Sequence, residues 1–280
     1  MPTLNPEDEP TRGASTPDLF RLDGKVAIVT GAAGLLGEQH AVALAECGAH
    51  VVLVDLNPDV CEQRARQIRE QHPVGALALR GDVTRKESWT AVLEQALAEF
   101  GRVDILVNNA AFTNQSRSAN YDADFSSFPV EDWHQILEVN LTGAFLGCQV
   151  VGRQMLQQQS GSIINIASLY GVVSPNHRLY PGTGTHQPVA YSVSKAGVIS
   201  LTRYLATLWA EQGVRVNSIT PGGVYDRHPE LFLQRYAHQS PMGRMARKDE
   251  MRGALIYLAA PASSYCTGHN LIVDGGWTAW

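Results

Sequence analysis

The chain has 280 residues, of which 44% are hydrophobic and 18% charged, so it can bury a sizeable core. Its net charge of −5 offers no basic surface for nucleic acid or anionic lipid, and no apolar run approaches the ~20 residues that cross a bilayer. We therefore expect a small-molecule partner, no nucleic acid and no membrane. The acidic, proline-rich start is unlike a secretory signal, and the four cysteines show no paired spacing. These features predict reduced thiols, no metal site and a cytoplasmic protein.

From Lys25 onwards, short apolar runs alternate with amphipathic segments. The runs are nearly continuous in Val, Ile and Leu, as in strands buried on both faces, and seven of them read as strands: Val26–Thr30, His50–Asp55, Ala76–Arg80, Val103–Asn108, Ser162–Ala167, Arg215–Ile219 and Asn270–Val273. Helical patterns lie between them: Leu35–Cys47, Asp59–Gln71, Arg85–Phe100, Val130–Gln158, Ala190–Gln212 and Lys248–Ala259. The alternation predicts an α/β protein with a single-domain Rossmann fold, a seven-stranded parallel sheet flanked by helices on both faces. Residues 1–20 lack periodicity and are expected to be a flexible N-terminal arm, followed by a dinucleotide-binding catalytic domain over residues 21–280.

The first predicted strand runs into a glycine-rich turn and then a helix. In Gly31-Ala-Ala-Gly34-Leu-Leu-Gly37, glycine lets the backbone approach a pyrophosphate at the positive end of the helix, although many strand–helix turns use glycine structurally. The next strand ends at Asp55, where a carboxylate accepts hydrogen bonds from the adenosine ribose. A 2′-phosphate there would face a like charge, and Ala32 and Ala33 supply no cation. The expected cofactor is therefore NAD and not NADP.

A second stretch, Tyr191-Ser-Val-Ser-Lys195, opens a long helical pattern. Four residues make about one helical turn, so the phenol and the ammonium should share a face. The ammonium favours the phenolate and moves the phenol pKa towards the range that proton transfer needs. Taken alone, the pentapeptide fits equally well a tyrosine and a lysine that merely share a surface.

These two stretches belong to a set of motifs that spans nearly the whole chain. The set also contains Asp82, Asn108-Asn109-Ala110, Asn140 in Val-Asn-Leu-Thr-Gly, Ser168 after the fifth predicted strand, and Pro221-Gly222. With these motifs the sequence resembles the short-chain dehydrogenase/reductase family in its single-domain branch. The resemblance implies a catalytic tetrad of Asn140, Ser168, Tyr191 and Lys195.

The tetrad divides the work between four side chains. Tyr191 exchanges a proton with the substrate oxygen, and Ser168 holds that oxygen by a hydrogen bond. Lys195 lowers the tyrosine pKa and reaches the nicotinamide ribose, and Asn140 anchors a water that relays protons. NAD is expected to contact Gly31, Gly34, Leu35, Leu36, Gly37, Asp55, Leu56, Asp82, Val83, Asn109, Ala110, Ala111, Tyr191, Lys195, Pro221, Gly222 and Val224.

The chain departs from the family pattern in four places. Leu35 stands where the family has its middle glycine, Ala111 replaces the glycine after Asn-Asn-Ala, and Asp226 stands at a frequent threonine. Ser168 and Tyr191 lie farther apart than in most members, because of an inserted loop over residues 174–188.

Substrate identity is expected to reside in this loop and in a second extension over residues 113–128. Both are rich in polar donors, and the residues predicted to contact substrate are Ser168, Tyr170, Asn176, His177, Arg178, Arg117 and Tyr191. A fatty-acyl or steroid pocket would need more apolar lining, so a sugar, sugar acid or polyol is favoured. The alternative, that these loops are solvated or pack at a subunit interface, stays open.

The function predicted from these residues is an NAD-dependent interconversion of a secondary alcohol and a ketone on a polar substrate. The alternatives are a 3-oxoacyl thioester reductase and a non-catalytic NAD-binding regulator. A nucleotide-sugar epimerase would need a larger C-terminal substrate domain than the residues after Lys195 provide. The helical patterns 130–158 and 190–212 are apolar on more than one stripe, and family members commonly pair these helices, so we expect a homotetramer.

Overall fold

Seven parallel strands form one sheet in the computed structural model, which describes residues 15–113, 123–184 and 186–280. The strand order is β3-β2-β1-β4-β5-β6-β7. The strands are β1 Val26–Thr30, β2 His50–Asp55, β3 Ala76–Arg80, β4 Ile105–Asn108, β5 Gly161–Ile166, β6 Val214–Pro221 and β7 Asn270–Val273. The predicted Rossmann fold with a seven-stranded parallel sheet is confirmed.

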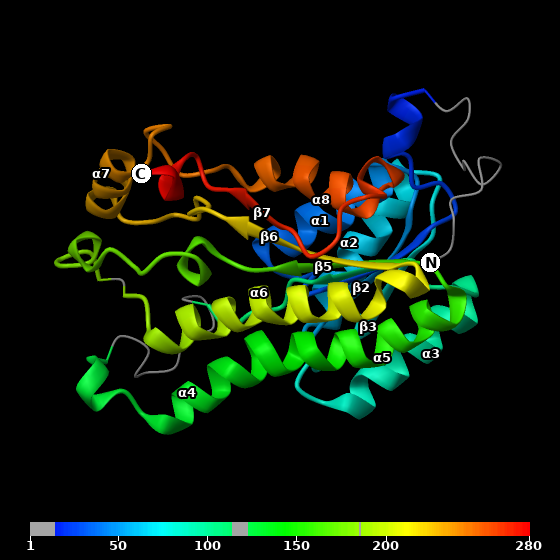
Figure 1. The fold of residues 1–280 in the computed structure, drawn as a ribbon, viewed down its shortest axis with the longest axis horizontal. Coiled ribbons are helices and arrows are strands. Elements are labelled where there is room, and N and C mark those ends of the chain that lie inside the picture. Colours follow the sequence, from blue (N-terminus) through cyan, green and yellow to red (C-terminus); the bar gives the residue numbers. More distant parts are fainter. Residues whose placement is uncertain (1–14, 114–122, 185) are drawn as a thin grey trace.

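Helices cover both faces of this sheet (Figure 1). The longer ones are α1 Leu35–Glu46, α2 Pro58–Gln71, α3 Lys86–Phe100, α4 Val130–Leu137, α5 Gly143–Gln158, α6 Val189–Trp209, α7 Glu230–Gln239 and α8 Arg252–Ala259. Side chains of α1, α2 and α8 form one buried cluster with the sheet, and side chains of α3, α5 and α6 form a second. Successive residues of a buried strand point to opposite faces, so β1 contributes Ala27 and Val29 to the first cluster and Val26 and Ile28 to the second.

The segment predicted as one helix over residues 130–158 is divided by a π turn. Helix α4 ends at Leu137, the π turn covers Glu138–Thr142, and α5 follows without a break. The Gly143 backbone N–H donates to the Glu138 carbonyl, five residues back. The extra residue changes which side chains face inward, and it leaves Asn140 almost fully buried.

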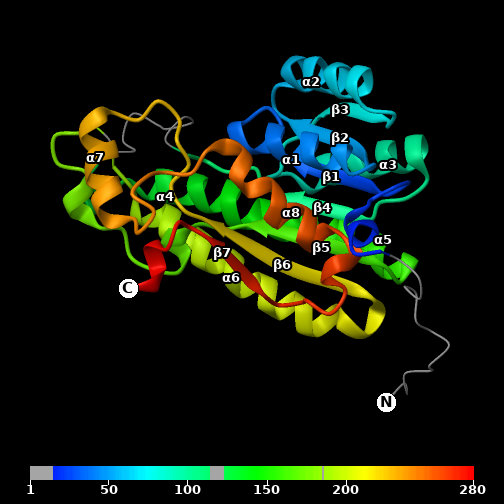
Figure 2. The same ribbon diagram turned by 90° about the horizontal axis from the view of Figure 1, so that it is seen from above.

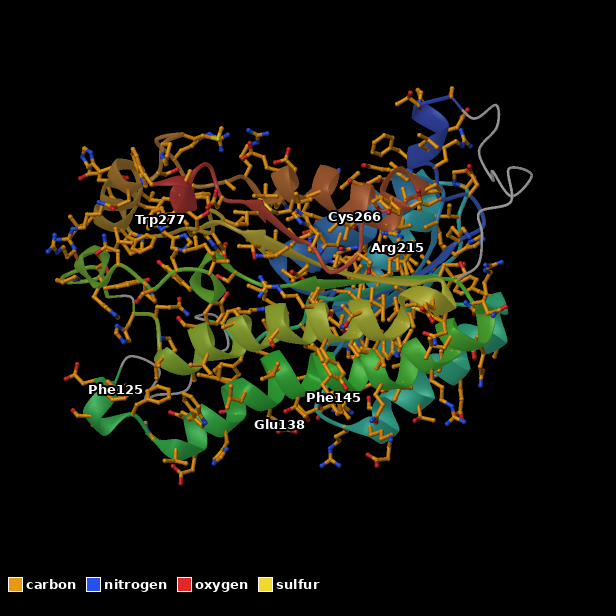
Figure 3. The ribbon with its side chains drawn as sticks, in the orientation of Figure 1. Phe125, Glu138, Phe145, Arg215, Cys266 and Trp277 are labelled. Carbon is orange, nitrogen blue, oxygen red and sulfur yellow. The ribbon has the colours of Figure 1, made fainter. Side chains whose placement is uncertain are left out.

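Helix α7 was not predicted, because it offers little periodicity. Only Phe232 and Tyr236 are buried among its residues. It lies beside the C-terminal segment at one end of the molecule (Figure 2), and there the ring of Trp277 stacks on Tyr236 with 4.5 Å between centroids (Figure 3). Arg215 lies at the opposite end of the sheet, where its guanidinium donates to the Leu258 carbonyl at 2.9 Å.

The start of the described chain is a short 3-10 helix, Pro17–Phe20, which contacts the 3-10 turn Pro261–Ser263. The division into an arm over residues 1–20 and a domain over residues 21–280 stays a prediction. Within the described ranges, none of the helices is both long and apolar enough to cross a membrane.

Candidate active site

A cavity of about 940 Å³ lies at the carboxyl ends of the strands. Crevices at this end of a parallel sheet are where such folds bind ligands. The lining contains every residue predicted to contact the cofactor except Gly37: Gly31, Gly34, Leu35, Leu36, Asp55, Leu56, Asp82, Val83, Asn109, Ala110, Ala111, Tyr191, Lys195, Pro221, Gly222 and Val224. The structure therefore gathers residues from six strand ends into one continuous site.

The glycine turn between β1 and α1 is packed so closely that side chains do not fit. Gly31 has a φ of +64°, and a side-chain carbon there would lie 2.8 Å from the Ala110 Cα. A side-chain carbon at Gly37 would lie 2.8 Å from the Ala32 Cα and against the Gly31 carbonyl. Gly37 thus stays outside the lining and instead holds α1 against the turn. Gly34 is the N-cap of α1, so the free N–H groups of that helix face the cavity end of the sheet.

Asp55 joins the end of β2 to this turn. Its two carboxylate oxygens accept from the Ala33 N–H at 3.0 Å and from the Asn57 N–H at 3.1 Å. The side chain is half-buried and lines the cavity next to Leu56, which is 63% exposed. Two backbone donors hold the carboxylate in place, where it faces an incoming ribose.

Arg64 of α2 is a contributor to the turn that the sequence did not predict. Its guanidinium donates to the Ala32 carbonyl, to the Gly34 carbonyl at 3.1 Å and to a Glu38 carboxylate oxygen at 3.5 Å. Its side chain is 19% exposed. The turn therefore has a cation after all, bonded to its carbonyl oxygens, although Ala32 and Ala33 themselves supply none.

These features fit a bound dinucleotide. The glycine turn keeps bulky side chains away from this end of the cavity, the N-terminus of α1 offers donors that suit a pyrophosphate, and Asp55 offers an acceptor that suits a ribose. At the other end, a side-chain carbon at Gly222 would lie 2.8 Å from the Asp274 Cα, so the backbone there is equally close-packed.

Ser168 and Tyr191 lie together in the cavity wall. Burial raises the pKa of Tyr191, and the Ser168 side chain opposes that rise only in part. The prediction that Lys195 lowers this pKa is wrong, because desolvation sets the direction of the shift. At neutral pH the phenol keeps its proton, which is the form that donates to a carbonyl oxygen.

Lys195 lies one helical turn from Tyr191, as predicted. Its Nζ is 5.7 Å from the Tyr191 ring centroid and donates to the Ile166 carbonyl at 2.7 Å. The side chain is buried, and desolvation lowers its pKa to about 8. An ammonium held by one carbonyl keeps two further donors for groups in the cavity.

Asn140 lies behind the cavity wall and links two of its segments. Its Oδ1 accepts from the Phe112 N–H at 2.6 Å, and its Nδ2 donates to the Ser194 Oγ at 3.1 Å. The Ser194 hydroxyl donates in turn to the Tyr191 carbonyl at 2.7 Å. Asn140 therefore fixes the start of α6, and a water anchored by it stays a prediction.

The predicted substrate residues divide into two groups. Ser168, Tyr170 and Tyr191 line the cavity, whereas Asn176, His177 and Arg178 do not. Asn176 caps the 3-10 helix His177–Leu179 by accepting from the Arg178 N–H at 3.1 Å, and His177 and Arg178 are exposed. Arg117 lies outside the described residues.

The cavity wall on the substrate side is instead largely aromatic. Its members come from the inserted loop and from the unpredicted α7 with the segment before it: Tyr180, Gln187, Asp226, His228, Phe232 and Tyr236. Sequence reasoning missed His228, Phe232 and Tyr236. Tyr180 and Gln187 do belong to the 174–188 loop, so this loop does contribute to the site. The aromatic spacing Phe232 to Tyr236 was the available signal, one turn apart on a short helix.

Comparison with known proteins places the chain in a family. A family model described as enoyl-(acyl carrier protein) reductase matches residues 31–278. The D-threitol dehydrogenase of Mycolicibacterium smegmatis is 37% identical over 275 residues, covering 92% of this chain and 95% of the relative. The chain is a short-chain dehydrogenase/reductase. The named relatives are dehydrogenases, which act on CH–OH groups with a nicotinamide cofactor. The chain is therefore an oxidoreductase.

Two further relatives align with almost the whole length of this short-chain dehydrogenase/reductase. The NAD-dependent glycerol dehydrogenase of Listeria innocua is 34% identical, over 92% of this chain and 96% of the relative. A solved structure of gluconate 5-dehydrogenase from Burkholderia cenocepacia, in complex with NADP and tartrate, has a TM-score of 0.83. It is 32% identical and covers 94% of this chain and 98% of that one.

Three of the four departures of this dehydrogenase/reductase from its family pattern lie on the cavity surface. Leu35, Ala111 and Asp226 line the cavity at the positions where glycine, glycine and threonine are usual. Asp226 places a carboxylate on the substrate side. The backbone N–H of Asp226 donates to His228 Nδ1 at 3.2 Å.

Proposed function

We propose that the protein is an NAD-dependent dehydrogenase that interconverts a secondary alcohol and a ketone on a sugar, sugar acid or polyol. One observation carries the proposal: a Ser168–Tyr191 pair lies in the same cavity as a dinucleotide-shaped cradle that ends at Asp55. The tyrosine supplies the proton and the cradle supplies the place for the redox cofactor.

The side chains of this site serve the two directions differently. When alcohol is oxidised, the Tyr191 phenolate takes the hydroxyl proton, and when ketone is reduced, the phenol returns it. Ser168 donates to the substrate oxygen and stabilises the charge that develops on it. Lys195 presents its remaining ammonium donors to the ribose and to the phenolate. The nicotinamide, when bound, accepts or gives the hydride of the carbinol carbon.

NAD is favoured over NADP by Asp55. A ribose 2′-phosphate would bring two negative charges beside a carboxylate held by two backbone N–H groups. Arg64 is already bonded to the carbonyls of the turn and to Glu38, so its charge serves the backbone. One relative is an NAD-dependent glycerol dehydrogenase and another was solved with NADP, so the assignment for this chain depends on Asp55.

A polar substrate is supported by the wall chemistry and by the relatives. Tyr170, Tyr180, Gln187 and Asp226 offer hydroxyl, amide and carboxylate groups. The relatives include a threitol, a glycerol and a gluconate dehydrogenase. The matching family model is described as an enoyl-(acyl carrier protein) reductase, which names an acyl thioester as substrate. A 3-oxoacyl thioester, whose ketone is the group that this site would reduce, is therefore the alternative substrate to test.

The assembly we propose is a homotetramer in the cytoplasm. The outer face of α5 and α6 exposes large apolar side chains: Phe145, Val193, Tyr204 and Leu208, of which Tyr204 is 66% exposed. Phe145 lies on the outward side of α5 (Figure 3). A second copy of the same face would cover these side chains. A monomer in light scattering at micromolar concentration would contradict this assembly, and the four free thiols suit a reducing compartment.

The experiment that tests the proposed function measures NADH formation with a panel of polyols and sugar acids. With a 3-oxoacyl thioester it measures NADH consumption. Wild type should turn over at least one polyol with NAD. Tyr191→Phe should lose about 10³-fold or more in kcat while NADH fluorescence titration gives an unchanged Kd. Wild type that binds NADH but turns over no alcohol or ketone would indicate a non-catalytic regulator.

A further inference from the structure

Two phenols meet in the substrate wall next to the reacting residues. The hydroxyl oxygens of Tyr170 and Tyr180 are 2.8 Å apart, and both side chains line the cavity. One phenol donates to the other, and the Tyr170 hydroxyl can form a further hydrogen bond with another hydroxyl group. Together the two phenols can both donate to and accept from one alcohol.

Tyr170 is tied to the catalytic centre from two directions. Its backbone N–H donates to the Ser168 Oγ at 3.3 Å. Burial raises the pKa of Tyr170, the hydrogen bond with Tyr180 opposes that rise, and the charge of the nearby Tyr191 phenolate adds to it. The Tyr170 ring therefore lies within electrostatic reach of the group that exchanges the proton.

Gln187 supplies a third polar group to the same wall. Its Nε2 is buried and has no hydrogen-bond partner among the residues that the structure describes. A buried amide N–H without an acceptor is unfavourable, so an acceptor that arrives with the substrate recovers part of that cost. A hydroxyl oxygen is such an acceptor.

Aromatic rings also line this part of the cavity. The rings of Tyr180 and Phe232 have centroids 5.9 Å apart, and those of Phe232 and Tyr236 are 6.1 Å apart. Ring faces suit the C–H surface of a carbon chain, while the phenols and the amide suit its oxygens. The wall thus fits a molecule with hydroxyl groups on one side and carbon on the other.

A carboxylate fits this wall less well than a hydroxyl. Among the described residues of the lining, the cations are Lys195, bound to the Ile166 carbonyl, and Arg227, whose Nε is 3.5 Å from an Asp226 carboxylate oxygen. The Asp226 carboxylate itself faces an anionic substrate with a like charge.

We propose that Tyr170, Tyr180 and Gln187 form a subsite for a hydroxyl group on the carbon next to the reacting carbinol. The substrate is then a vicinal diol, and in the reverse direction an α-hydroxy ketone. This inference rests on the proposed function, because it places the subsite beside Tyr191.

A matched series of four-carbon alcohols tests the subsite. 2-Butanol, 2,3-butanediol and 3-hydroxybutanoate share the CH3–CH(OH) group. They differ in the rest of the chain, which carries no further polar group, a hydroxyl on the next carbon, or a carboxylate one carbon further along. With each stereoisomer and NAD, wild type should show a kcat/KM for the diol about 30-fold or more above that for 2-butanol, and above that for the acid. Tyr170→Phe and Gln187→Leu should each shrink the ratio of kcat/KM for the diol over that for 2-butanol to within about threefold.

Tyr225→Phe is the control, because Tyr225 lies close to the cavity but outside its lining. It should keep the wild-type preference, and NADH titration should give one Kd for all variants. Equal kcat/KM for diol and 2-butanol in wild type overturns the subsite and leaves the proposed function standing. A diol preference that survives in both Tyr170→Phe and Gln187→Leu overturns it too. Failure of the proposed function looks different, since no alcohol would then yield NADH.

Discussion

The two halves of the cavity are built in different ways. The cofactor half is formed by backbone: Gly31 and Gly222 each lie so close to another segment that a Cβ would collide with it, and Gly37 packs equally closely behind the lining. The substrate half is formed by side chains that stack in sequence, from Tyr180 through Phe232 to Tyr236. One half depends on side chains being absent, and the other on which side chains are present.

The difference shows how the same fold can keep one ligand and change another. Backbone donors and glycine surfaces recognise a dinucleotide whatever the neighbouring sequence is. The aromatic half is bonded to the cofactor half where the Tyr236 hydroxyl accepts from the Gly223 N–H at 2.7 Å. The ring of Trp277 stacks on Tyr236, so the C-terminal turn supports the substrate wall.

The largest effect is expected from adding a side chain to the tightly packed glycine turn behind the cofactor half. Gly37→Ala places a methyl group against the Gly31 carbonyl and the Ala32 Cα, which are backbone atoms and cannot move aside. We expect a loss of about 3 kcal/mol in the free energy of unfolding, measured by urea denaturation, and loss of NADH binding. Gly253→Ala is the control, because nothing lies within 4 Å of the added carbon and α8 gains a better helix former. Equal stability of the two variants would contradict the close packing.

The pH dependence of turnover tests the burial of Tyr191. Since burial raises the pKa of the phenol, the phenolate that oxidises alcohol becomes more abundant as pH increases. The kcat/KM of alcohol oxidation should rise by about tenfold per pH unit between pH 7 and 9, whereas ketone reduction should stay level. Ser168→Ala should move the oxidation profile to higher pH, because its hydrogen bond lowers this pKa. An oxidation rate that is flat over this range would show that the phenol is already ionised at pH 7.

Cofactor choice tests the carboxylate at the end of β2. Asp55→Asn should lower the ratio of kcat/KM for NAD over NADP by about 30-fold, because the repulsion of a 2′-phosphate is removed. Adding Leu56→Arg, at the exposed neighbouring position of the lining, should invert the preference. Asp59→Asn, an exposed acid in the first turn of α2, should change nothing. A wild type that prefers NADP would refute the assignment.

A smaller effect concerns stability below neutral pH. His40 of α1 is fully buried, neither ring nitrogen has a partner among the described residues, and burial lowers its pKa from 6.5 to about 4. Its stabilising contribution is complete above pH 6.5 and is lost as pH falls towards 4, because the unfolded chain takes up the proton first. Between pH 7.5 and 5, wild type should lose about 2 kcal/mol more unfolding free energy than His40→Leu.

The control for this effect is His238→Leu, which removes an exposed histidine of α7. It should keep the wild-type pH dependence in urea denaturation. The same pH dependence in wild type and His40→Leu would show that His40 is solvated in the folded protein.

The strands and the cofactor half could be predicted from the sequence because their signals are local. Buried parallel strands read as apolar runs, and the residues at their carboxyl ends meet at one edge whatever the loops do. That is why Gly31, Asp55, Asn109 and Gly222 line one cavity as expected.

The remaining features depend on packing between distant segments. The π turn at Glu138–Thr142 adds one residue without breaking the helical pattern, so the sequence shows a single helix. In the inserted loop, a 3-10 helix buries Leu179 and turns His177 and Arg178 outward, although their chemistry favoured a binding role. Arg64 reaches the glycine turn only because α2 packs beside α1.

The most direct test of the account measures NADH affinity and diol preference side by side in one variant from each half. Arg64→Met removes the cation that holds the glycine turn and should raise the NADH Kd about tenfold while leaving the ratio of kcat/KM for 2,3-butanediol over 2-butanol at its wild-type value. Tyr170→Phe should do the reverse, and Arg66→Met, an exposed arginine of the same helix, should do neither. An Arg64 variant that changes substrate preference, or a Tyr170 variant that weakens NADH binding as strongly, would contradict the separation of the two halves.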